Sequence, residues 1–77
     1  MRAKTPQRVV TFASTSDALA MEAAARERGI PGRVIPVPSE IDAGCGLAWC
    51  APTGIALEGM LEAAGVQYEA IYVIEMY

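Results

Sequence analysis

Histidine is absent from this chain of 77 residues, so the most common general base and metal ligand of proteins is missing. Cysteine occurs only twice, as Cys45 and Cys50, which leaves a tetrahedral metal site short of ligands. No stretch approaches the roughly 20 apolar residues of a membrane span, and no apolar segment follows the basic N-terminal residues to make a signal peptide. We therefore expect a cytoplasmic protein with reduced thiols, no bound metal and no membrane partner.

Basic residues are missing from most of the chain. All six lie within the first 33 positions, every charge after Arg33 is acidic, and the net charge is −3. A surface that binds nucleic acid needs a stripe of lysine and arginine to replace counterions, so we expect no nucleic acid partner. The hydrophobic fraction of 53% suffices for the core of one small domain over residues 1–77 and leaves apolar surface to spare. Self-association into a homo-oligomer therefore stays open.

Capping signals predict two helices. The first begins at Ser14, whose spacing to Asp17 is typical of a capping box, and it ends at Gly29. The second begins either with Pro52 as the first helical residue or with Thr53 as the N-cap, and it runs to residue 64.

Runs of β-branched and aromatic residues predict four strands after a flexible leader at residues 1–6. The strands are expected at residues 8–13, 33–37, 45–49 and 66–77. The order β-α-β-β-α-β places two helices on one face of an antiparallel sheet, and right-handed connections leave few arrangements. We predict an α+β, ferredoxin-like sandwich with strand order 4-1-3-2. Pro36 supports this order, because it makes the second strand an edge, where a missing N–H group is tolerated.

Cys45 is the first candidate for chemistry, because it stands between Gly44 and Gly46 and has no bulky neighbour in sequence. In the predicted topology the start of the third strand lies beside the end of the first, which leads into Ser14 and Thr15. Amides and the positive dipole end of the first helix would then lower the pKa of the thiol, with Gly44, Gly46, Ser14 and Thr15 around it. The alternative is that Cys45 is a small buried hydrophobic residue.

Cys50 follows five residues later, on an odd spacing that points the two side chains to opposite faces of an extended strand. The two cysteines would then be about 16 Å apart, too far for a disulfide unless the chain folds back. Trp49, beside Cys50, either fills the core or anchors an interface.

The run from Val34 to Ala48, with its Ile-Pro-Val-Pro and Gly-Cys-Gly segments, resembles the signature of the selenium/sulfur (Se/S) carrier-like family. Residues 10–15 and 22–30 also resemble that family, and the resemblance covers about residues 8–75. It implies that Cys45 is the carrier thiol and that the partners are sulfur or selenium donor and acceptor enzymes. Many relatives have a basic residue where this chain has Trp49 and Cys50, a departure that makes Cys50 a candidate resolving thiol.

Three hypotheses follow. In the first, the Cys45 thiolate accepts a sulfur or selenium atom as a persulfide or selenyl-sulfide, a transfer role that needs no cofactor and no catalytic machinery of its own. In the second, the domain is a non-catalytic interaction or ligand-sensing module with a structural Cys45. In the third, Cys45 and Cys50 form a dithiol switch. Replacing Cys45 by serine would inactivate a carrier and leave an interaction module intact.

Overall fold

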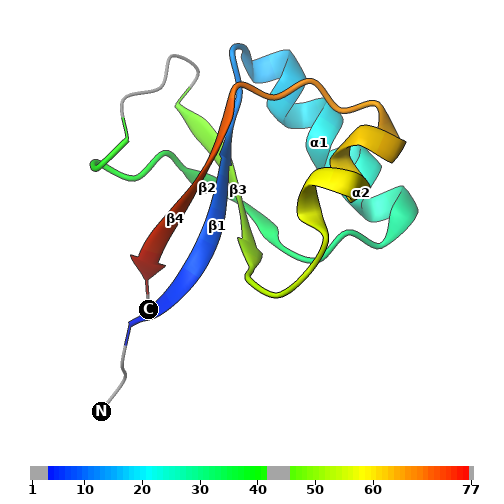
Figure 1. The fold of residues 1–77 in the computed structure, drawn as a ribbon. Coiled ribbons are helices and arrows are strands. Elements are labelled where there is room, and N and C mark those ends of the chain that lie inside the picture. The colour runs from blue at the N-terminus through cyan, green and yellow to red at the C-terminus, as the bar shows by residue number, and fades with distance from the viewer. Residues whose placement is uncertain (1–3, 42–45, 77) are drawn as a thin grey trace.

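The computed structural model describes residues 4–41 and 46–76. Within these ranges the chain forms six elements, in the order β-α-β-β-α-β (Figure 1). They are β1 (Thr5–Thr11), α1 (Thr15–Arg28), β2 (Arg33–Pro36), β3 (Leu47–Pro52), α2 (Leu57–Ala64) and β4 (Ala70–Met76).

The strands of the described residues form one antiparallel sheet in the order β2-β3-β1-β4. This order is the predicted 4-1-3-2 seen from the other edge, and α1 and α2 lie together on one side of the sheet (Figure 1). The ferredoxin-like prediction is therefore confirmed, including the edge position of β2, whose Pro36 ends the strand. β1 is central because Val10 pairs with Trp49 on one side and with Ile71 on the other.

The boundaries of α1 follow the predicted capping signals. Ser14 is the N-cap, and its Oγ accepts a hydrogen bond of 3.2 Å from the backbone N–H of Asp17. Gly29 adopts the left-handed conformation, with φ of 71°, and its N–H donates to the carbonyl of Ala25 at 2.8 Å. Both ends of α1 therefore satisfy backbone groups that a bare helix terminus would leave unpaired.

Three strand starts differ from the prediction. β3 begins at Leu47 rather than residue 45. β1 begins at Thr5 rather than residue 8, and Thr5 pairs with Met76, so residues 5 and 6 belong to the sheet and not to a leader. β4 begins at Ala70 rather than residue 66, because Val66 packs against the helix-side core. Pairing with the distant Met76 decided the start of β1, and local propensity does not reveal such a partner.

The predicted start of the second helix is wrong. Pro52 is the last residue of β3, paired with Gln7, and Thr53 precedes a turn in which Gly54 has φ of 84°. α2 begins only at Leu57, and its N-cap, Ala56, makes no side-chain hydrogen bond. The buried side chains of α2, rather than a capping residue, therefore hold the helix on the sheet.

Buried side chains gather on both faces of the sheet. Among the described residues, the helix-side core contains ten that are buried: Val10, Phe12, Ala18, Met21, Ala25, Ile30, Trp49, Ala51, Leu57 and Leu61. The opposite face, called here the helix-free face, buries Val9, Ile35, Ile41, Ala48 and Cys50. Ile41 belongs to the connection between β2 and β3, so the described part of this connection packs on the helix-free face. Burying an isoleucine side chain stabilises the fold by about 2 kcal/mol, which anchors the connection there.

Trp49 belongs to the core and does not anchor an interface. Its side chain is buried, and its indole N–H donates to the carbonyl of Pro31 at 3.1 Å. Gly32, next along the chain, has φ of 129°, and a Cβ there would overlap the carbonyl oxygen of Cys50 and the Trp49 indole. The segment between α1 and β2 can therefore cross the indole only with glycine at position 32.

We predict that Gly32→Ala destabilises the protein by more than about 2 kcal/mol, because backbone strain and steric overlap add. The matched control is Gly59→Ala in α2, where an added Cβ meets nothing within 4 Å. This control should stabilise the protein by up to about 1 kcal/mol through helix propensity. Urea unfolding followed by the fluorescence of the single tryptophan measures both effects. Equal stability of the two variants would contradict the packing described for Gly32.

A second prediction concerns the ion pair in which Arg8 of β1 donates to Glu58 of α2. The Arg8 hydrogen bond and, next, a backbone hydrogen bond lower the pKa of Glu58 below its ordinary value. The pair therefore stabilises the fold above the pKa of an unfolded glutamate, about 4.3, and this contribution is lost as the pH falls through the lowered pKa.

Carbon NMR of the Glu58 carboxyl group should show its pKa rising in Arg8→Met. The control Arg26→Met removes a cation that is not a partner of Glu58 and should leave that pKa unchanged. An equal rise in both variants would show that overall charge, and not this contact, sets the pKa.

Candidate functional site

The start of β3 lies at the same end of the sheet as the start of α1. Ala48 pairs with Thr11, the last residue of β1, and α1 begins four residues after Thr11 (Figure 1). The sequence predicted this proximity from the topology. It follows from the antiparallel register, because the end of one strand then lies beside the start of its neighbour.

The predicted carrier thiol, Cys45, and its neighbour Gly44 lie outside the described residues, so their roles stay predictions. Gly46, on the other side of Cys45, is exposed and has φ of 81°. Its carbonyl accepts a hydrogen bond of 3.1 Å from the N–H of Val37, which closes the β2–β3 hairpin. An added Cβ at Gly46 would meet nothing within 4 Å, so its backbone conformation, and not a lack of space, favours glycine.

Ser14 and Thr15, the predicted binding residues at the start of α1, are both exposed. The Oγ of Ser14 serves as the helix cap, and its O–H group remains able to donate. Thr15 is the first residue of α1, where backbone N–H groups have no acceptor within the helix and the dipole is positive. Backbone N–H groups and the two exposed hydroxyl groups would together attract an anion here.

The charged side chains on the segments that meet at this end are acidic. Residues 11–17, 36–41, 46–48 and 68–70 include Asp17, Glu40 and Glu69 and contain no lysine or arginine. Glu69 is held beside the end of β1, because its N–H donates to the carbonyl of Thr11 at 2.7 Å. Among the described residues of these segments, the start of α1 is therefore the source of positive potential, and the carboxylates oppose it.

Cys50 is a buried free thiol on the helix-free face, 4% exposed, where it pairs with Val9 of β1 and Arg33 of β2. Its thiol makes a weak hydrogen bond of 3.8 Å to Oε1 of Gln7, and its sulfur lies 4.0 Å from the Met76 sulfur. A reagent in solvent can reach this sulfur only if the packing around it opens. The resolving role predicted for Cys50 stays untested.

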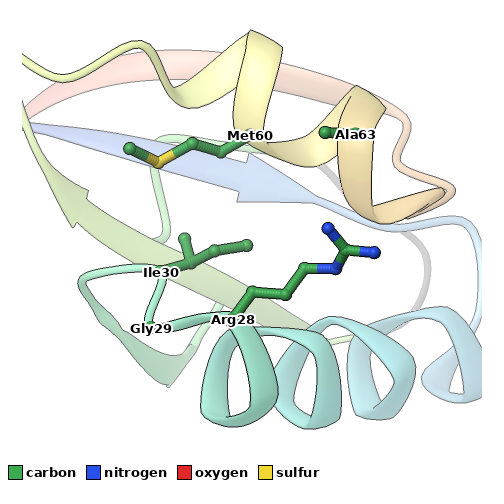
Figure 2. A pocket seen from close by; sticks show the side chains of 5 residues that line it. All are labelled: Arg28, Gly29, Ile30, Met60 and Ala63. Carbon is green, nitrogen blue, oxygen red and sulfur yellow. The ribbon is translucent and has the colours of Figure 1, made fainter.

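A hollow of about 200 Å³ lies between the end of α1 and α2 (Figure 2). Ile30 and Met60 form its apolar walls, and the Arg28 guanidinium extends toward α2 at its mouth. The sequence did not predict this hollow. The favourable interaction with the helix dipole is a sufficient reason for Arg28 in the last turn of α1, so this residue gave no signal of a hollow. α1 has 14 residues, so about 20 Å of helix separates the hollow from the start of α1.

Across residues 4–41 and 46–76, no three acidic or cysteine side chains come close enough together to bind a metal ion. Over the same residues, no helix has the length and apolar character needed to cross a membrane.

Comparison with known proteins identifies the family. Residues 7–73 match the sequence profile of a family described as "Putative Se/S carrier protein-like". No curated protein and no solved structure matches the chain. The match covers nearly the whole fold, from β1 to the middle of β4, and includes both cysteines. The chain therefore belongs to the Se/S carrier protein-like family.

Proposed function

We propose that this protein carries a sulfur or selenium atom on the thiol of Cys45, between a donor enzyme and an acceptor enzyme. The observation that carries the proposal is the family match, which extends across position 45 and reaches from residue 7 to residue 73. The burial of Cys50 adds to it, because a carrier needs a sulfur that a second protein can reach, and this requirement favours Cys45.

The proposed transfer exchanges a sulfur–sulfur bond without a net change of oxidation state. The Cys45 thiolate attacks the outer sulfur of a persulfide on the donor enzyme, a new sulfur–sulfur bond forms, and the donor's cysteine thiolate leaves. The product is a Cys45 persulfide, which a nucleophile on the acceptor enzyme attacks in turn, so that the Cys45 thiolate is released. Selenium would follow the same course, with a selenyl-sulfide in place of the persulfide.

The charges around the start of α1 indicate what the partner enzymes contribute. The start of α1 favours a thiolate nearby, whereas Asp17, Glu40 and Glu69 disfavour one. A donor enzyme with basic side chains around its own cysteine would neutralise these carboxylates on docking and raise the thiolate fraction. Partners with a basic docking surface therefore suit the proposal, and added salt should weaken their association.

We predict that incubation with a cysteine desulfurase and cysteine adds about 32 Da to the wild-type protein and to Cys50→Ala, but not to Cys45→Ser. A selenocysteine lyase with selenocysteine should likewise add about 79 Da. Intact mass spectrometry measures the adduct, which must disappear with dithiothreitol, because two added oxygen atoms also give about 32 Da. Equal loading of Cys45→Ser would place the persulfide on Cys50 and contradict the role proposed for Cys45. No loading of any variant would favour the interaction-module hypothesis instead.

A further prediction tests the accessibility of Cys50. In Cys45→Ser, iodoacetamide should alkylate Cys50 at least about tenfold more slowly in the native protein than in urea, because the folded thiol is buried. Mass spectrometry of timed samples gives both rates. Native alkylation as fast as that of glutathione would contradict the buried position of Cys50 and support a direct resolving role.

A further inference from the structure

β4 forms one edge of the sheet, and among the described residues nothing pairs with its outer side. The strand has seven residues, and six of them are uncharged, Glu75 being the exception. Val73 is 62% exposed and Tyr72 40% exposed. The other edge, β2, has four residues and ends in Pro36. A short strand with proline is protected against pairing, whereas a long uncharged strand is a template for it.

We propose that two copies of the chain pair through β4 in an antiparallel manner, which joins their sheets into one. The two-fold axis passes through Val73, the middle residue of the strand, so that Ala70 lies opposite Met76 of the second copy and all seven residues pair. Each copy then satisfies the free backbone groups of the other, as a closed two-fold interface requires.

Charge favours this register. With the axis at Val73, Glu75 lies opposite Ile71 of the second copy, and no carboxylate faces another across the pair. Moving the axis to Tyr72 would place Glu75 opposite Glu69 of the second copy, and moving it to Glu75 would place two copies of that glutamate together. Like charges directly opposite each other destabilise a strand pair.

The side chains are also self-complementary in this register. On the helix-free face, Tyr72 lies opposite Ile74 of the second copy, a favourable aromatic and β-branched pair that occurs twice by symmetry. On the helix side, the two Val73 side chains lie opposite each other and bury the most exposed apolar residue of the strand. A second copy of β4 thus offers a complementary residue opposite each position of the strand. For this reason we propose a second copy as the partner and not a strand of another protein.

The test uses the full chain in sedimentation velocity from about 1 to 300 μM. The wild type should change from monomer to dimer over this range, since a single strand pair is a small interface and gives micromolar affinity. Val73→Lys should weaken the dimer at least tenfold, because two lysines then face each other. The matched control is Leu19→Lys on α1, a residue 55% exposed, which changes the charge equally and should not change the dimer.

A mixture of Val73→Lys and Val73→Glu should recover the dimer as a heterodimer in native mass spectrometry, because lysine then faces glutamate across the axis. Recovery also shows that both variants fold. If the variants do not fold, hydrogen exchange of the wild type decides: amides of β4, but not of β2, should gain protection as the concentration rises.

Several results would overturn the proposal. They are a wild type that stays monomeric to 300 μM, a dimer equally weakened by Leu19→Lys, a mixture that does not recover, and β4 amides whose exchange is independent of concentration. Loading of Cys45 is a separate measurement, so failure of this proposal is distinguishable from failure of the carrier function.

Discussion

The antiparallel register between β1 and β3 fixes both cores and the position of the candidate site. It pairs Val9 with Cys50 and Val10 with Trp49, and these neighbours point to opposite faces of the sheet. A slip of one residue would exchange the side chains of the two cores and move Trp49 away from the Pro31 carbonyl. The same register brings the start of β3 to the end of β1, so the stability of the sheet and the placement of the candidate site have one cause.

Different parts of the chain cover the two faces of the sheet. Two helices cover one face, whereas Val37 and Ile41 of the connection between β2 and β3 pack on the other. This connection is fixed on both sides of residues 42–45, by the burial of Ile41 and by the hydrogen bond between Val37 and Gly46. A small protein has little apolar surface to bury, so its connections also have to serve the core.

The distribution of charge gives the molecule two different ends. Arg26, Arg28 and Arg33 lie at the end of α1 and the start of β2, where two of them complement the helix dipole. The segments around the start of α1 carry carboxylates instead. The asymmetry visible along the sequence thus becomes an asymmetry in space, and a partner that approaches the start of α1 meets negative charge. The proposed dimer edge, β4, carries a single charge and lies along the side of the sheet.

Local features of the sequence were enough to predict the order of the elements, both ends of α1, the edge position of β2 and the family. These features depend on local signals: Ser14 three residues before Asp17, Gly29 with its left-handed conformation, Pro36 without an N–H group, and the motif around Cys45. The carrier role of Cys45 itself is a prediction from that motif, and it lies outside the described residues.

Tertiary structure alone decided the start of β1 at Thr5, the start of α2 at Leu57 and the burial of Cys50. Thr5 joins the sheet because Met76, 71 residues away, pairs with it. The residues next to Thr5 in sequence do not indicate this pairing. Pro52 and Thr53 have the composition of a helix start, but pairing with Gln7 holds Pro52 in the strand. Cys50 is buried because Ile41 and Met76 pack on the same face as its thiol. Each outcome depends on contacts between segments distant in sequence, and their energy outweighs the propensity of the segment itself.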